Sequence, residues 1–122
     1  MQDSLSYTVF EYLYRDAANY KAHGLILLRG CFSERHEADI RKYCEQGEYF
    51  VAEQLDIPSL CELLWVESSG PSEDDHGWHE FIGLRPPEVG EETALNEWGK
   101  LDELLVRFRS VKEWNLRLSK NA

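Results

Sequence analysis

The sequence predicts an α+β fold: a single layer of mixed or antiparallel sheet, about four strands, packed by about three helices in the order β-β-α-β-α-β-α. Two observations lead to this class. Residues 7–30 hold two apolar runs joined by a polar bend, and their β-branched and aromatic residues are typical of paired strands. The later segments mix hairpin and crossover links, which differs from the repeated βαβ units of a doubly wound nucleotide fold.

The length and composition indicate one globular unit. A chain of 122 residues can bury one core, so residues 1–122 are expected to form a single α+β domain. No apolar run approaches the roughly 20 residues that a membrane-spanning helix needs. The first ten residues lack the basic and apolar regions of a secretory signal. We therefore expect a cytoplasmic protein that does not contact a membrane.

The first strand is predicted over 7–14 and the second over 24–28. Both faces of the first strand are largely apolar, which places it inside a sheet and requires the later helices to pack on it. The bend 15–23 is too long for a tight hairpin turn. One face of the first strand carries Phe10, Tyr12 and Tyr14, and the other carries Val9 and Leu13.

A helix is predicted over 34–46, followed by a strand over 48–56 and a short second helix. Ser33 is a suitable N-cap for the first helix, and Gly47 is placed to end it. Pro58 suits the first turn of the second helix, where its missing N–H has no partner. In the strand between them, Tyr49, Val51 and Glu53 are expected to face opposite to Phe50, Ala52 and Gln54.

The last two predicted elements are a strand over 77–85 and a long helix over 94–118. Pro86 and Pro87 end the strand because proline cannot donate to a ladder. The strand should place Trp78, Ile82 and Leu84 on one face and His79, Phe81 and Gly83 on the other. The helix has an apolar stripe at three- and four-residue steps, formed by Leu95, Trp98, Leu101, Leu104, Leu105, Phe108, Val111 and Trp114.

Acidic residues are concentrated in residues 67–97, which include the predicted strand over 77–85. The chain has a net charge of −10, and residues 67–97 carry nine acids and one base. A negative patch beside an exposed aromatic residue can steer a basic partner and then anchor it. We therefore expect a small acidic, inhibitor- or immunity-like interaction protein without enzyme activity. A charge run that only keeps the protein soluble is the competing interpretation. The expected partner-binding residues are Glu73, Asp74, Asp75, Trp78 and Glu80.

The same segment supports an alternative, a metal-dependent hydrolase or metal-binding protein. Its candidate ligands are Asp74, Asp75, His76 and His79, because carboxylate and imidazole groups bind zinc, manganese or iron. An H-x-x-H spacing brings two imidazoles together on a helix. On a strand it directs them to opposite faces, and His79 is predicted on a strand. The strand interpretation therefore favours a solvated acidic loop beside a satisfied surface histidine over a metal ligand.

Other chemistries find little support. The negative charge argues against a nucleic-acid surface, and the common glycine-rich phosphate loops are absent, so no cofactor is expected. The three cysteines, Cys31, Cys44 and Cys61, are widely spaced and are expected to be buried reduced thiols, since His36 is not clearly placed to activate one. A homodimer remains an option, in which Lys100, Arg107 and Lys112 meet the acidic patch of a second copy.

Two short segments carry a resemblance. The run YLYRDAANYKAHG resembles a segment of small bacterial proteins without an assigned activity, and DDHGWHEF is similar to their second polar stretch. The resemblance covers about a third of the chain. It implies a bacterial cytosolic protein and no particular chemistry. Immunity proteins of polymorphic toxin systems share the size and acidity, but no functional residue is carried over from them.

Overall fold

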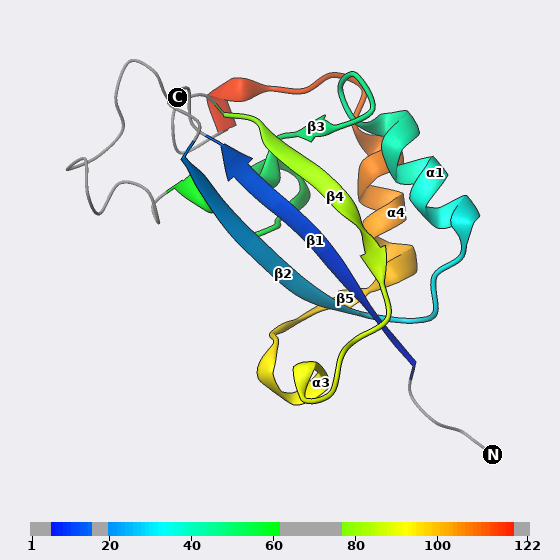
Figure 1. Ribbon diagram of the computed structural model, residues 1–122. Helices are drawn as coiled ribbons and strands as arrows, with labels where there is room; N and C mark the ends of the chain where they lie inside the picture. Colours follow the sequence, from blue (N-terminus) through cyan, green and yellow to red (C-terminus); the bar gives the residue numbers. More distant parts are fainter. Residues whose placement is uncertain (1–5, 16–19, 62–76, 119–122) are drawn as a thin grey trace.

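The computed structural model of the chain describes residues 6–15, 20–61 and 77–118. These residues form one open, mixed sheet of five strands together with three α-helices, so the predicted α+β class is confirmed with one additional strand (Figure 1). The strands are β1 (Tyr7–Arg15), β2 (Lys21–Arg29), β3 (Tyr49–Phe50), β4 (His79–Arg85) and β5 (Glu97–Lys100). The helices are α1 (Glu34–Tyr43), α3 (Glu91–Ala94) and α4 (Leu101–Ser110), with 3₁₀ turns η1 (Ala52–Leu55) and η2 (Leu116–Leu118). Within the described ranges, no helix is long and apolar enough to span a bilayer.

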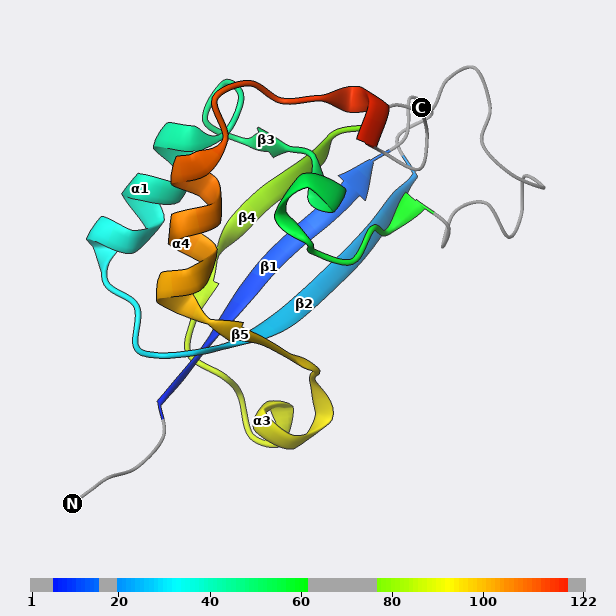
Figure 2. The same cartoon turned by 180° about the vertical axis from the view of Figure 1, so that it is seen from behind.

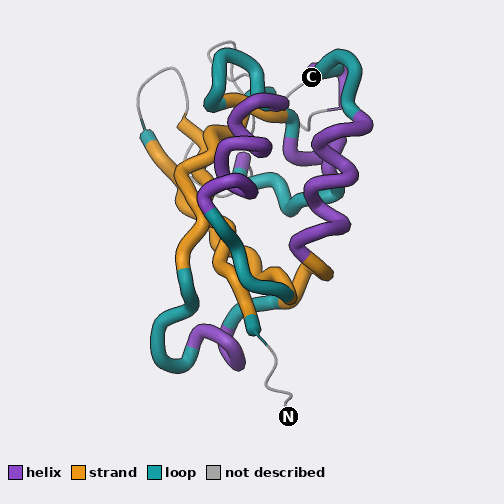
Figure 3. Tube along the Cα trace, turned by 90° about the vertical axis from the view of Figure 1, so that its right-hand side faces the viewer, coloured by secondary structure: helices purple, strands orange, loops and turns teal. Residues whose placement is uncertain are grey.

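The strand order in the sheet is β3-β4-β1-β2-β5. β1 lies at the centre and pairs antiparallel with β2 over its whole length, from Tyr7 opposite Arg29 to Arg15 opposite Lys21. β4 is antiparallel to β1 on its other side, whereas β5 is parallel to β2. α1 and α4 contact each other and lie together on one face of the sheet, while α3 lies beyond one end of the strands (Figure 3).

The core between the sheet and the two long helices is built around Phe10. Its ring lies 5.0 Å from that of Phe81, 5.9 Å from that of Phe50 and 6.4 Å from that of Phe108, measured between centroids. All four side chains are at most 2 % exposed. Burial of one such side chain contributes on the order of 1.5–3 kcal/mol. The hydrophobic effect on this face therefore holds β1, β3, β4 and α4 together.

A bulge in β4 changes which side chains enter the core. Phe81 lies opposite Tyr12 and Gly83 lies opposite Glu11, so Ile82 is the additional residue in β4. Phe81 and Leu84 consequently both point into the core, and Ile82 is 43 % exposed. The predicted alternation, which grouped Leu84 with Ile82 and opposite Phe81, is wrong because the bulge shifts the two-residue period by one position.

The run predicted as a strand over 48–56 is mostly a turn. Only Tyr49 and Phe50 pair with β4, and the chain then forms η1, which ends at Asp56 in a left-handed conformation with φ of 61°. Ala52 and Leu55 are both fully buried, and a 3₁₀ turn brings residues three apart to the same side. A strand would point them to opposite faces. Tertiary burial thus overrides the local strand pattern.

The long helix predicted over 94–118 is shorter than expected at both ends. α4 covers only Leu101–Ser110 and buries the expected stripe of Leu101, Leu104, Leu105 and Phe108. Before it, Gly99 adopts a φ of 153°, which is outside the helical region, and the chain forms β5. After it, residues 111–118 pass β3 (Figure 2), and Glu113 and Asn115 bond to Gln54 of η1. The helix predicted over 34–46 is confirmed to Tyr43, but the helix predicted after Pro58 falls mainly outside the described residues.

The face of the sheet opposite α1 and α4 carries both apolar side chains and ion pairs. Arg85 of β4 bonds to Glu11 of β1, and Arg15 of β1 lies 3.2 Å from Glu80 of β4. Val9 and Leu13 lie between these charged residues in the strand register and are at most 5 % exposed. The aliphatic stems of long charged side chains can shield apolar neighbours in this way. Among the described residues, the expected helical covering of β1 is therefore found on one face only.

Candidate functional site

Two tryptophans are in contact at the surface where residues 111–118, the C-terminal segment, pass β3. The rings of Trp78 and Trp114 lie 6.4 Å apart in an edge-to-face arrangement, and the ring of Tyr49 also lies 6.4 Å from that of Trp78. All three side chains are half-buried. We call this group, Tyr49, Trp78 and Trp114, the tryptophan surface. Its members come from three distant parts of the chain, so only the folded protein assembles it.

Contacts with α4 and with the end of α1 hold the tryptophan surface against the core. Trp114 packs edge-to-face on Phe108 of α4, with ring centroids 6.3 Å apart, and its indole N–H donates to the carbonyl oxygen of Tyr43 at 3.2 Å. Trp78 directly precedes β4, whose first residue, His79, is buried. The two indoles therefore have defined positions and present their remaining area to solvent.

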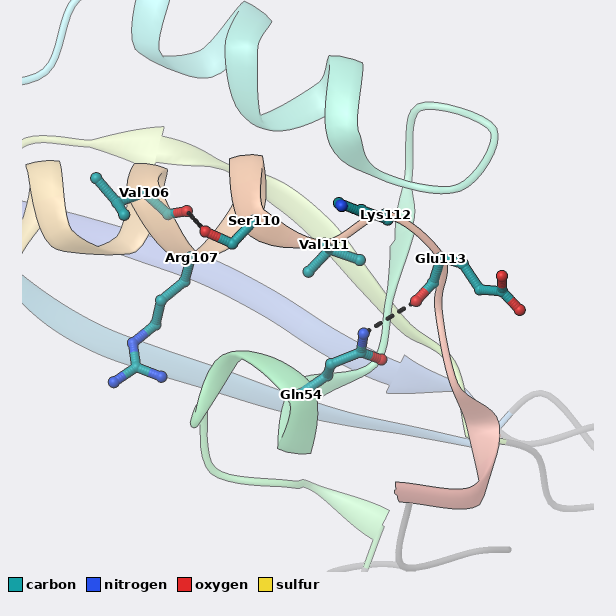
Figure 4. A pocket seen from close by; sticks show the side chains of 7 residues that line it. All are labelled: Gln54, Val106, Arg107, Ser110, Val111, Lys112 and Glu113. Carbon is teal, nitrogen blue, oxygen red and sulfur yellow. Dashed lines mark hydrogen bonds between the residues drawn. The ribbon is translucent and has the colours of Figure 1, made fainter.

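The side chain of Gln54 holds the C-terminal segment in place. Its amide nitrogen donates to the carbonyl oxygen of Glu113 at 3.0 Å, and its amide oxygen accepts from the backbone N–H of Asn115 at 2.9 Å. One side chain in η1 thus satisfies backbone groups on both sides of Trp114, as a neighbouring strand would. Figure 4 shows Gln54 reaching from η1 toward Glu113, and Figure 2 shows the segment passing β3.

Charged side chains of both signs surround the tryptophan surface. A surface hollow of about 500 Å³ is lined by Trp78 and Trp114 together with Lys42, Lys112, Glu45 and Glu113. A second hollow of about 620 Å³ lies next to it, between α4 and η1, and shares Lys112 and Glu113 (Figure 4). Glu48, beside Tyr49 in the sequence, is also exposed. This combination of aromatic area and charged rim is typical of a macromolecular contact.

Two of the five residues predicted to bind a partner lie within the described part of the chain. Trp78 was expected to be exposed and is instead half-buried against Tyr49 and Trp114. Glu80 retains 19 % of its side-chain exposure and pairs with Arg15. The acidic residues Glu73, Asp74 and Asp75 lie outside the described residues. The structure therefore supplies an aromatic partner, Trp114, that the strand and helix patterns did not associate with Trp78.

His79, one of the four predicted metal ligands, is a core residue and not the surface histidine that the sequence favours. It is fully buried, and its Nε2 atom accepts a hydrogen bond from the backbone N–H of Leu60 at 3.0 Å. The rings of Tyr14 and Phe50 lie 5.4 and 5.9 Å from it. In this arrangement the Nε2 lone pair is engaged by an amide and does not face a ligand.

The other three predicted metal ligands, Asp74, Asp75 and His76, lie outside the described residues, and the metal hypothesis stays a prediction for them. Within residues 6–15, 20–61 and 77–118, no three histidine, cysteine or acidic side chains gather to hold a metal ion.

The cysteines differ in exposure. Cys44 and Cys61 are buried as expected, whereas Cys31 is exposed, which corrects the prediction that all three are buried. Desolvation by burial raises the pKa of the Cys44 thiol to about 12, an effect that the charge of Arg41 opposes in part. At neutral pH this thiol is therefore protonated and a poor nucleophile. The ring of His36 bonds to Ser33 at the start of α1, where it completes a capping box.

The chain matches no protein-family model, no curated protein and no solved structure.

Proposed function

We propose that the protein binds a basic protein partner through the tryptophan surface and the acidic residues next to it. The observation that carries the proposal is the contact between Trp78 and Trp114, two half-buried indoles whose rings lie 6.4 Å apart. Tryptophan is enriched among the residues that contribute most to protein–protein affinity, because one ring buries a large area at a low entropic cost. Packing on Phe108 orders Trp114 before a partner arrives.

The charges around this surface favour a basic partner. Glu45, Glu48 and Glu113 are exposed there, and in the sequence Glu73, Asp74 and Asp75 precede Trp78 by three to five positions. The chain as a whole carries a net charge of −10, which attracts a cationic protein over a distance of about one Debye length. Lys42 and Lys112 in the same hollow would then meet acidic groups of the partner and fix its orientation.

A small acidic protein of this kind acts by occupying its partner. An inhibitor- or immunity-like protein has to cover the working surface of a basic target, and it needs no reaction of its own. The tryptophan surface supplies the apolar contact for such binding. The acidic residues raise the association rate by attracting the basic partner.

The test begins with identification of the partner by capture from source cells at 0.15 M salt. The captured protein should be basic, and its affinity and association rate are then measured with purified components. Replacing Trp78 by alanine should weaken binding by at least about 2 kcal/mol, or about thirtyfold, mainly through faster dissociation. Reversing Glu73, Asp74 and Asp75 to lysine should mainly slow association.

A matched variant separates local from total charge. Reversal of three exposed acidic residues elsewhere, Glu34, Glu88 and Glu92, changes the net charge by the same amount and should slow association much less. Equal slowing by the two triple variants, together with unchanged binding by Trp78→Ala, would contradict the proposal.

A further inference from the structure

β2 is only partly paired on the side away from β1. β5 pairs with Leu27, Leu28 and Arg29, and the backbone N–H of Leu27 donates to the carbonyl oxygen of Asn96 at 3.1 Å. Backbone groups along a strand point alternately to its two sides. Those of Lys21, His23 and Leu25 therefore point to the same side as those of Leu27. Among the described residues, no strand pairs with this stretch of β2.

The opposite edge of the sheet is protected. Beyond β3, side chains of α1 occupy the outer backbone groups of β4. Glu37 accepts a hydrogen bond from the N–H of Leu84 at 2.9 Å, and Arg41 donates to the carbonyl oxygen of Ile82 at 2.9 Å. An unprotected strand edge is a template for pairing with another chain. The described residues block this template at β4 and leave it open at Lys21, His23 and Leu25 of β2.

We propose that a second copy of this chain pairs with the open edge of β2, so that two sheets join across a twofold axis at His23. In antiparallel pairing about this axis, His23 lies opposite His23 of the second copy, and Lys21 lies opposite Leu25. The three residues that direct their backbone groups outward are thus complementary to themselves, as an isologous interface requires. Because β5 covers β2 from Leu27 onward, the pairing ends there and the assembly closes as a dimer.

The charges on this edge fit the same arrangement. Lys21 lies opposite Arg15 in the β1–β2 register, and like charges opposite one another are unfavourable. Lys21 forms no ion pair with any residue in the described part of the chain. Leu25 lies opposite Glu11. The twofold axis therefore places Lys21 of each copy next to Leu25 and one strand away from Glu11 of the other, within reach of its flexible side chain.

The dimer buries side chains as well as backbone groups. Lys21 and His23 are exposed and Leu25 is half-buried in one chain. Their side chains share the sheet face that α1 and α4 leave uncovered, so the Lys21 stem of one copy would cover Leu25 of the other. The interface shares no residue with the tryptophan surface, so this inference stands independently of the proposed function.

Sedimentation velocity of the full chain between about 1 and 500 μM at 0.15 M salt tests the inference. One chain has a mass of 14.3 kDa, so the expected dimer has twice that, 28.6 kDa. His23→Pro removes a donor that points away from β1, and it should weaken the dimer at least about tenfold while the monomer keeps its fold. Leu25→Lys, which adds a charge to the same edge, should act in the same direction. A wild-type monomer at 500 μM would overturn the inference, and so would a dimer unaffected by both folded variants.

Hydrogen exchange gives a second measurement that needs no substitution. Amide protons of Lys21, His23 and Leu25 should exchange slowly in a concentrated sample and quickly in a dilute one. Those of Ala22, Gly24 and Ile26, which bond to β1, should stay protected in both. Fast exchange of the first group in a sample shown to be dimeric would place the interface elsewhere and overturn the inference.

Discussion

Gly24 lies directly opposite Tyr12 in the β1–β2 hairpin, and the Tyr12 ring occupies the space that a side chain at Gly24 would need. A Cβ atom at Gly24 would come within 2.7 Å of Tyr12 Cζ and 2.9 Å of a methyl group of Leu60. The Tyr12 hydroxyl reaches past Gly24 to donate to the carbonyl oxygen of Pro58 at 2.7 Å. Because Gly24 has no side chain, the Tyr12 ring can lie over the neighbouring strand β2. Its hydroxyl can then hydrogen-bond to the segment after η1.

Replacing Gly24 by alanine should therefore destabilise the protein. Overpacking in a core typically costs about 1–3 kcal/mol, and the backbone atoms of a central hairpin have little room to move. The free energy of urea-induced unfolding gives the measurement. Tyr12→Leu alone should also destabilise, but the double variant should be more stable than the sum of the two changes predicts. Strict additivity would contradict the proposed clash.

Replacing His79 distinguishes a core residue from a metal ligand. In His79→Leu the buried backbone N–H of Leu60 loses its acceptor, so the free energy of unfolding should fall by about 1–3 kcal/mol. His79→Gln keeps an acceptor near the position of Nε2 and should lose less. Zinc content measured on the same samples provides the contrast, because loss of about one equivalent of zinc at unchanged stability would favour the metal hypothesis.

The central part of the fold follows from local patterns in the sequence. The strand with aromatic residues at every second position, the Ser33 cap and the leucine stripe of α4 each predict their element correctly, because side-chain period and burial agree there. The pattern fails where tertiary contacts decide. A helical period continues through Trp98, but the chain there forms β5, since Gly99 leaves the helical region and the edge of β2 is available for pairing.

The candidate site was predictable only in part. The acidic run and Trp78 identify a region of interest in the sequence. The surface position expected for His79 is wrong, because the residue is fully buried in the core. Trp114 and Gln54 carry no local signal, because their positions depend on the end of α4 at Ser110 and on the path of the chain beyond it. Contacts between residues more than fifty positions apart cannot be read from periodicity. The bulge at Ile82 is missed for the same reason.

Acid should weaken the fold through Glu91. Two hydrogen bonds from the guanidinium of Arg85, followed in size by one from the backbone N–H of Glu88, lower the pKa of Glu91 from 4.5 to about 2. A carboxyl whose pKa is lowered by folding stabilises the folded state above its unfolded pKa. That stabilisation is lost as the pH falls from about 4.5 to 2.

The Glu91→Gln variant tests this pH dependence. It should be less stable than wild type at pH 7, and its urea midpoint should change less between pH 4.5 and pH 2. Glu92→Gln makes the same change of charge at an exposed neighbour that forms no ion pair with the described residues, so it should behave as wild type. Parallel curves for wild type and Glu91→Gln would contradict the assignment.

The protection of the β4 edge by α1 should be measurable as resistance to association. Glu37→Ala and Arg41→Ala each free one backbone group of β4, and each should lower the free energy of unfolding by about 1 kcal/mol.

The double variant exposes Ile82, already 43 % exposed, beside an unpaired strand edge. Light scattering at rising concentration should then detect aggregation, because a free apolar edge is a template for further strands. Glu34→Ala with Arg35→Ala, exposed on the same helix, provides the matched control and should scatter as wild type. Aggregation of the control to the same extent would show that lost charge, and not the opened edge, is the cause.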